Sequence, residues 1–234
     1  MANPFVPFLV VGLGEAALAT QTPWWVALPL GWASAGTLWT ALAYALARPR
    51  MLGKLDAPAI AAVLLAPVLR GARIAAVVVR KIDQRLLGPG GSERIEVAPG
   101  LWVGGWPRRG AGDLAQLDLT AELPQRGTAL RYACIPMLDG APMSDADFHA
   151  GVAQVLAWRA EGLPVLVHCA YGHGRSVAVL VGAMVAEGLA PDWATAHAHV
   201  LAVRPRAKMT AAQRAVVARC TTGSPDVLRS GQRA

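Results

Sequence analysis

The fold of this chain is decided by the stretch Val165-Leu166-Val167-His168-Cys169-Ala170-Tyr171-Gly172-His173-Gly174-Arg175-Ser176. Residues Leu163–His168 are an apolar run of the length and composition of a buried strand. The strongly apolar run Ser176–Glu187 has the length of a helix. The sequence therefore predicts a strand, a short glycine-containing loop and a helix, with a cysteine at one end of the loop and an arginine at the other.

The residue types in this loop favour binding of a phosphoryl group. Gly172 and Gly174 permit backbone conformations that other residues avoid, so that successive N–H groups can point inward. The following helix would add the positive end of its dipole, which also stabilises the thiolate of Cys169. The planar guanidinium of Arg175 can hold two phosphoryl oxygens at once, which a lysine cannot do. We therefore expect a phosphate-binding loop that contains a nucleophilic thiol.

The pattern His168-Cys169-X5-Arg175-Ser176 resembles the signature of cysteine-based protein tyrosine and dual-specificity phosphatases. The resemblance implies that Cys169 attacks phosphorus to form a phosphocysteine and that Arg175 binds the phosphoryl group and stabilises the transition state. It also implies that Ser176 assists departure of the thiolate and that His168 tunes the cysteine. No metal and no other cofactor is implied. The residues expected to contact substrate are those inside the loop: Ala170, Tyr171, Gly172, His173 and Gly174.

Covalent catalysis of this kind needs an acid to protonate the leaving alcohol. The family places an aspartate on a loop about thirty residues before the cysteine, and Asp139 stands 30 positions before Cys169, after the run Ile135–Leu138. Asp145 and Asp147 are nearby alternatives, but they fall at the expected start of a helix, where an aspartate commonly caps. Asp139 is therefore the predicted general acid.

The resemblance extends over residues 93–220. Val97–Gly105 looks like the entry strands of dual-specificity phosphatases, and Arg204-Pro205 followed by Gln213 resembles their C-terminal helix pair. Strand and helix patterns alternate, which predicts an α/β fold with a central sheet flanked by helices. The predicted strands are Arg94–Val97, Leu101–Gly104, Asp118–Glu122, Ala129–Ile135 and Leu163–His168. The predicted helices are Asp113–Leu117, Asp145–Glu161, Ser176–Glu187, Ala194–Ala202 and Thr210–Cys220.

The N-terminal fifth of the chain has the composition of a membrane segment. Residues 1–47 contain one acid, Glu15, and neither lysine nor arginine. Pro23–Ala47 is about 25 residues without a charge, which is long enough to cross a bilayer. Tryptophans and arginines flank this run as they do at membrane interfaces: Trp24, Trp25, Arg48 and Arg50. Residues 1–50 are therefore predicted to anchor the chain in a membrane through one or two transmembrane helices, because Phe5–Ala19 is either the first arm of a hairpin or a partly inserted segment.

The net charge of +7 is concentrated after this apolar region. Residues 51–92 are predicted to be a basic, amphipathic juxtamembrane segment and linker, which either lies on the membrane surface or packs on the catalytic domain. Basic residues next to a span favour the cytoplasmic side, so the catalytic domain is expected there, at the inner or plasma membrane. Apolar runs between these charges argue against a nucleic-acid partner. Residues 93–222 are then the expected phosphatase domain, and 223–234 a tail.

The remaining cysteines and the loop histidine leave alternatives open. Cys134, Cys169 and Cys220 form no disulfide framework and no zinc-ligand spacing, which fits a reducing compartment. Cys134 is either a core residue or a partner for a protective disulfide with Cys169. His173 either contacts a second acidic group of the substrate or faces solvent.

The sequence thus predicts a phosphomonoester hydrolase that acts through a phosphocysteine. Membrane anchoring, the basic segment and the Gly172-His173-Gly174 loop favour a membrane lipid phosphate as substrate. One alternative is a tyrosine or dual-specificity phosphatase that acts on phosphoproteins. Another is a membrane-tethered pseudophosphatase that only binds phosphate, which the presence of cysteine, arginine and aspartate disfavours.

Overall fold

The computed structural model describes residues 5–52, 94–107 and 109–222, and positions 63, 66, 67, 78 and 82 between them. Apart from those positions, the expected juxtamembrane segment after residue 52 and the tail at 223–234 lie outside the described residues. The chain divides into two compact units. One contains the N-terminal helices with the loops Ala121–Pro124 and Leu138–Ala141, and the other contains the sheet and the C-terminal helices.

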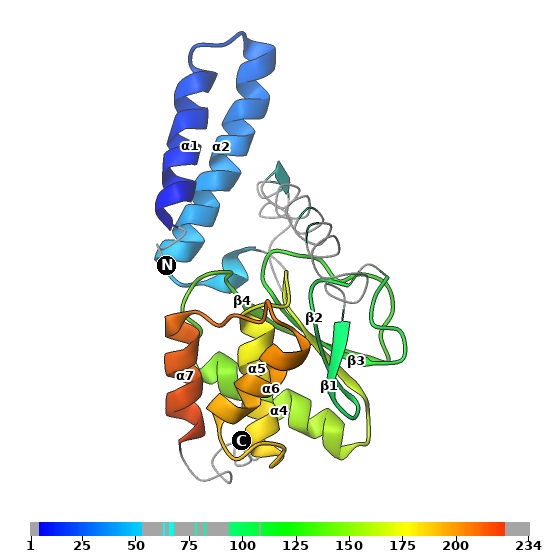
Figure 1. Cartoon of the computed structure of the whole chain (residues 1–234). Coiled ribbons are helices and arrows are strands. Elements are labelled where there is room, and N and C mark those ends of the chain that lie inside the picture. The colour runs from blue at the N-terminus through cyan, green and yellow to red at the C-terminus, as the bar shows by residue number, and fades with distance from the viewer. Residues whose placement is uncertain are drawn as a thin grey trace. The chain divides into compact units, whose positions relative to one another are not determined.

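The first unit is built on a pair of apolar helices that lie side by side, α1 (Phe5–Ala19) and α2 (Trp24–Ala45), as Figure 1 shows. Small residues let the two backbones approach closely, because a Cβ on Gly12 would lie 2.8 Å from the Leu38 side chain. The Ser34 hydroxyl donates to the Gly12 carbonyl oxygen at 2.8 Å. This hydrogen bond satisfies a hydroxyl group that is buried in α2.

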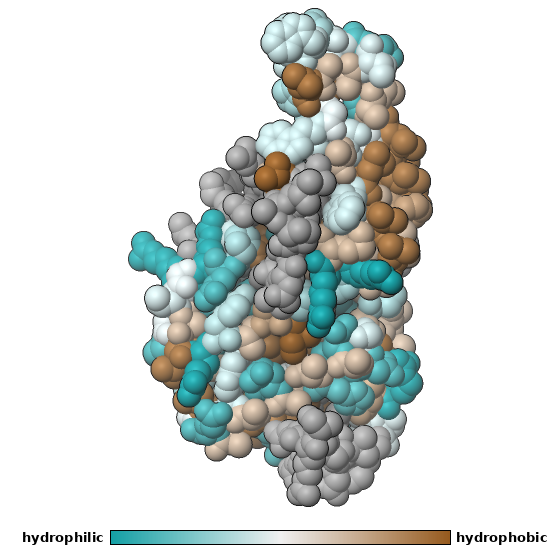
Figure 2. All heavy atoms as spheres, turned by 180° about the vertical axis from the view of Figure 1, so that it is seen from behind, coloured by the Kyte–Doolittle hydropathy of each residue, from teal (hydrophilic) through white to brown (hydrophobic). Residues whose placement is uncertain are grey.

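Helix α2 is, by length and composition, the one helix among the described residues that could cross a membrane. Its 22 residues span about 33 Å, against about 30 Å for a bilayer core. Helix α1 has 15 residues and is too short to do so without tilt or thinning of the bilayer. Large apolar side chains are exposed on both helices, among them Val10, Leu13 and Leu28, and Figure 2 shows apolar atoms gathered along this pair.

The C-terminal end of α2 is packed against the two loops of its unit. A 3₁₀ turn, η1 (Pro49–Leu52), follows α2. Ala43 and Leu52 form a buried cluster with Ala121 and Leu138, one residue from each loop. The loop at 138–141 is therefore held by apolar contacts with the end of the N-terminal helix pair.

The second unit contains a five-stranded sheet of order β1-β2-β5-β3-β4. Its strands are β1 (Arg94–Ala98), β2 (Leu101–Gly104), β3 (Ala115–Thr120), β4 (Arg131–Met137) and β5 (Val165–His168). Strand β1 is antiparallel to β2, whereas β2, β5, β3 and β4 are mutually parallel. The carboxyl ends of these four strands meet at one edge, which is where open α/β sheets bind ligands.

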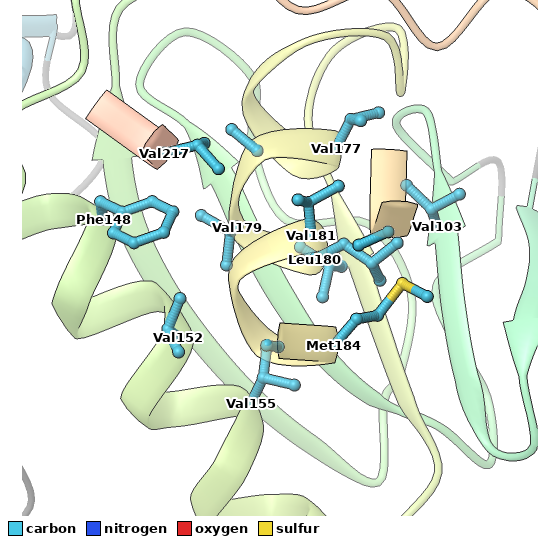
Figure 3. Close-up of a cluster of buried hydrophobic side chains, with 14 of the residues drawn as sticks. Val103, Phe148, Val152, Val155, Val177, Val179, Leu180, Val181, Met184 and Val217 are labelled. Carbon is cyan, nitrogen blue, oxygen red and sulfur yellow. The ribbon is translucent and has the colours of Figure 1, made fainter. Parts of the chain in front are cut away.

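Four helices complete this unit: α4 (Asp145–Ala160), α5 (Arg175–Ala186), α6 (Trp193–Val203) and α7 (Ala211–Thr221). Helix α5 is buried along its whole length and contacts each of the other three. Figure 3 shows its side chains interdigitated with Phe148, Val152 and Val155 of α4 and with Val217 of α7. This packing explains why the run after Ser176 is apolar all round. The predicted α/β fold, with a central sheet flanked by helices, is confirmed.

One predicted element is wrong. The sequence predicted a helix over Asp113–Leu117, but residues 115–117 belong to β3. Polar Gln116, Asp118 and Thr120 alternate with Leu117 and Leu119, and this period of two is the pattern of a strand. Every residue of β3 is buried because the strand lies between β5 and β4 in the sheet.

Candidate active site

Cys169 follows β5 directly, and Arg175 is the first residue of α5, so the Cys169–Arg175 loop joins the sheet edge to a helix N-terminus. The Cys169 side chain is buried, with 3% of the residue exposed. The Gly172 N–H donates to its sulfur at 3.2 Å, and the Ser176 Oγ lies 3.4 Å from the sulfur. The loop is therefore curled around the thiol, and the donors and helix dipole at the sulfur stabilise a thiolate.

Gly172 makes this curl possible. Its φ of +73° lies in the left-handed region, which residues with a side chain rarely adopt. A Cβ at this position would lie 2.5 Å from the carbonyl carbon of Gly104 at the end of β2. The backbone of the loop therefore approaches the sheet edge more closely than any residue other than glycine allows.

Two residues hold the outside of the loop through its carbonyl oxygens. The Trp106 N–H donates to the Ala170 oxygen at 3.0 Å. Arg204, which is 1% exposed, donates from Nε to the Gly172 oxygen at 2.8 Å and from Nη2 to the Tyr171 oxygen at 3.1 Å. Burial lowers the pKa of Arg204, and the negative charge of the nearby Cys169 opposes this shift. Arg204 thus anchors the loop and adds positive charge near the thiolate. Sequence analysis assigned it no such role.

Arg175 is equally buried, with 1% of the residue exposed. Its Nη1 donates to the carbonyl oxygens of Met137 at 2.7 Å and Leu119 at 3.3 Å. These carbonyls belong to the carboxyl-terminal ends of β4 and β3. One edge of the guanidinium is therefore fixed by the sheet, which leaves little rotational freedom to be lost when an anion binds.

His168 lies beneath the loop in a polar cluster that the sequence did not reveal. Its Nδ1 is 3.3 Å from the Cys169 oxygen, and its Nε2 is 2.9 Å from Nε2 of Gln116. A neutral imidazole that donates from Nδ1 and accepts the Gln116 amide N–H satisfies both contacts. Asp118 pairs with His168 in the register of β3 and β5, and its Oδ2 lies 3.7 Å from Nε2.

Asp118 is itself held by several donors. Its Oδ1 accepts from the N–H and the hydroxyl of Thr120 at 2.9 and 2.8 Å, and Oδ2 accepts from the Tyr132 hydroxyl at 3.1 Å. Burial and then the charge of Asp118 raise the pKa of Tyr132 far above its usual range, so Tyr132 remains a donor. This cluster fixes the base of the strand from which the Cys169–Arg175 loop departs.

Asp139 lies two residues beyond the end of β4, whose Met137 carbonyl binds Arg175. The carbonyl oxygen of Asp139 accepts a hydrogen bond from the Tyr44 hydroxyl at 3.0 Å. The two alternative acids have other partners. Asp145 accepts from Arg219 Nε at 3.0 Å, which lowers the pKa of Asp145, and Asp147 accepts from the Ser144 hydroxyl at the start of α4. The role of Asp139 as the acid stays a prediction.

Three further observations concern the loop histidine, the cysteines and metal binding. The His173 ring lies near that of Tyr171, with centroids 6.2 Å apart. All three cysteines are thiols. Within the described part of the chain, no cluster of three or more His, Cys, Asp or Glu residues could hold a metal ion.

Comparison with known proteins agrees with this architecture. Residues 116–225 match the family model described as PTP-SAK: Swiss Army Knife protein, DSP-PTPase phosphatase domain. No curated protein matches the chain. The structure of DUSP15 has a TM-score of 0.50 and 22% identity, with 62% of this chain and 98% of that chain covered.

Human DUSP28 gives a TM-score of 0.50 and 19% identity, again with 62% of this chain and 98% of that chain covered. PTPMT1 gives a TM-score of 0.44 and 16% identity, with 60% and 99% covered. At these identities the likeness to DUSP15 and DUSP28 shows a shared fold. The match of residues 116–225 to the DSP-PTPase family model supports phosphatase activity for the chain.

Proposed function

We propose that this phosphatase is a cysteine-dependent phosphomonoester hydrolase in which Cys169 is the nucleophile. The observation that carries the proposal is the buried thiol, surrounded by the Gly172 N–H and the Ser176 hydroxyl at the N-terminus of α5. A sulfur in this environment is ionised more readily than a thiol in an apolar core. The adjacent Arg175 supplies a fixed cation for the phosphoryl oxygens.

In the first step, the Cys169 thiolate attacks phosphorus and forms a sulfur–phosphorus bond. The bond between phosphorus and the leaving oxygen breaks, and the carboxyl group of Asp139 gives its proton to that oxygen. Arg175 and the loop N–H groups bind the equatorial oxygens, where charge is spread in the transition state. The products of this step are an alcohol and a phosphocysteine.

In the second step, water attacks the phosphocysteine while the Asp139 carboxylate accepts a proton from it. The sulfur–phosphorus bond breaks, and inorganic phosphate leaves. The Ser176 hydroxyl, 3.4 Å from the sulfur, and the Gly172 N–H stabilise the departing thiolate. The enzyme returns to its initial state with Asp139 protonated and Cys169 ionised.

We further propose that the substrate is a membrane lipid phosphate and that α2 anchors the chain. Support comes from the span-length helix α2, from the apolar side chains exposed on α1 and α2, and from the basic residues that follow in the sequence. The loop that carries Asp139 packs in the same unit as the end of α2. The basic residues after the span support a cytoplasmic position for the catalytic domain.

A substrate comparison tests the lipid proposal. The full chain, reconstituted in phosphatidylcholine vesicles, is assayed against phosphatidylglycerol phosphate in the same vesicles and against phosphotyrosine and phosphoserine peptides. We expect kcat/KM to be at least about tenfold higher for the lipid, equivalent to about 1.4 kcal/mol of transition-state binding. A higher kcat/KM for a peptide than for the lipid would contradict the lipid proposal and favour a phosphoprotein substrate.

Replacement of the acid tests the mechanism. In Asp139→Ala, kcat/KM for alkyl phosphates should fall about 10²-fold, because a basic alkoxide cannot leave without a proton. The fall for 4-nitrophenyl phosphate should be much smaller, since nitrophenolate is a stable leaving group. The matched control is Asp147→Ala, which removes a carboxylate engaged with Ser144 and should keep the wild-type ratio of the two substrates. An unchanged ratio in Asp139→Ala would mean that another residue is the acid.

A further inference from the structure

We propose that Tyr44, at the end of the N-terminal helix pair, is a positioning residue for the general acid. Its hydroxyl donates to the backbone oxygen of Asp139 at 3.0 Å across 95 positions of sequence. The inference rests on the proposed role of Asp139. It adds that the membrane anchor is part of the catalytic machinery and does more than bring the enzyme to its substrate.

The position of Tyr44 is set by the helix pair itself. The residue lies in the last turn of α2, and its ring stacks on that of Phe8 in α1, with centroids 5.5 Å apart and planes at 28°. One hydroxyl therefore connects the packed helices to the acid loop. A change in the packing of α1 on α2 would move the donor.

The residues on either side of Asp139 are also fixed. Leu138 is 5% exposed and lies in the buried cluster with Ala43 and Leu52. Gly140 has a φ of +70°, so the chain turns sharply directly after the acid. The Tyr44 hydroxyl bonds the carbonyl oxygen of the peptide group between Asp139 and Gly140 and so constrains the plane of that group. The orientation of this peptide plane sets the direction of the Cα–Cβ bond of Asp139, which carries the carboxyl group.

Among the steps up to the phosphocysteine, the orientation of the acid affects the transfer of its proton to the leaving oxygen. A displacement of about 1 Å in a catalytic group can cost up to about 10²-fold in rate. Loss of the Tyr44 bond should therefore slow the departure of basic leaving groups and leave activated ones nearly unchanged. A loss of stability alone would lower the rates with all substrates by the same factor.

The test compares Tyr44→Phe with the wild type as full chains in detergent micelles. The phenylalanine keeps the ring that stacks on Phe8 and removes only the donor. For a series from 4-nitrophenyl to phenyl to alkyl phosphate, kcat/KM reports the steps up to the phosphocysteine. We expect Tyr44→Phe to be about three- to tenfold slower with alkyl phosphate, the size of one lost hydrogen bond, and within about twofold of wild type with 4-nitrophenyl phosphate.

Thr40→Val is the matched control, because it also removes one hydroxyl from α2. The Thr40 hydroxyl donates within the helix, to the Gly36 oxygen at 2.9 Å. This variant should keep the wild-type dependence on leaving group. If Thr40→Val and Tyr44→Phe behave alike, or if Tyr44→Phe lowers kcat/KM for all substrates by the same factor, Tyr44 has only a structural role and the inference fails.

The double variant separates this inference from the proposed function. In an Asp139→Ala background, Tyr44→Phe should not make the dependence of kcat/KM on the leaving group any steeper, because no acid remains to be positioned. If Asp139→Ala alone leaves the dependence on leaving group unchanged, the assignment of the acid is wrong. If Asp139→Ala steepens the dependence and Tyr44→Phe does not, the assignment of Asp139 stands and the role of Tyr44 is refuted.

Discussion

Replacing Cys169 by serine is expected to reduce kcat by on the order of 10⁵, while phosphate binding remains. The Gly172 N–H and the Ser176 hydroxyl that stabilise a thiolate cannot ionise an alcohol at neutral pH, because a hydroxyl is a much weaker acid than a thiol. Serine is nearly isosteric, so the N–H groups of the loop and Arg175 should still bind the anion.

The measurement has two parts: single-turnover hydrolysis of 4-nitrophenyl phosphate, and the stabilisation of the full chain by inorganic phosphate in thermal unfolding. Phosphate should raise the unfolding temperature of wild type and Cys169→Ser by similar amounts. Substantial turnover by the serine variant would show that the sulfur is not the nucleophile. Loss of phosphate binding along with activity would show that the substitution had disrupted the loop.

Cys220→Ser is the control for general effects of removing a thiol. Cys220 is buried in α7, and burial raises the pKa of its thiol, so it remains protonated at neutral pH. Burial outweighs the charge of the nearby Arg219, and a buried thiol that stays protonated is a poor nucleophile. Cys220→Ser should therefore retain the activity of the wild type, and the contrast with Cys169→Ser isolates the effect of the loop.

The elements that were predicted correctly from the sequence are those that a single continuous stretch of residues specifies. The strand before Cys169, the loop with its glycines and the apolar helix after Arg175 follow one another in the chain, and each pattern is local. Helix α2 was likewise evident from one uncharged run. The α/β fold and the phosphatase class followed from these segments and are confirmed, whereas the roles of individual site residues stay predictions.

What sequence analysis missed depends on partners that are far apart in the chain. Asp118 lies beside His168 because β3 and β5 pair in a particular register, and no local pattern reveals a register between parallel strands. Arg204 reaches carbonyl oxygens 32 and 33 positions earlier, and an arginine before a proline gives no sign of such targets. The alternation in Gln116–Thr120 was a usable signal for β3, and the short helix predicted at Asp113–Leu117 obscured it.

Replacing Arg175 by lysine is expected to lower kcat/KM by on the order of 10³ although the positive charge is kept. The guanidinium carries five N–H donors in a planar fork, and its Nη1 donates to the Met137 and Leu119 carbonyl oxygens. An ammonium group is a single point donor. It cannot reach both carbonyls at the sheet edge and also bind two phosphoryl oxygens.

The expected loss is separated from unfolding by a control at a partly exposed contact in which another arginine donates to a carbonyl oxygen. Arg159 donates from Nη1 to the Pro99 oxygen at 2.9 Å and from Nε to Glu187 at 3.1 Å. Pro99 precedes β2, so this contact lies at the amino edge of the parallel strands, opposite the Cys169–Arg175 loop. Arg159→Lys should lower the unfolding temperature slightly and keep kcat/KM. Arg175→Lys should lose both kcat/KM and stabilisation by phosphate. If it retains both, positive charge alone suffices at this position, and the bidentate grip on the phosphoryl group has no part in catalysis.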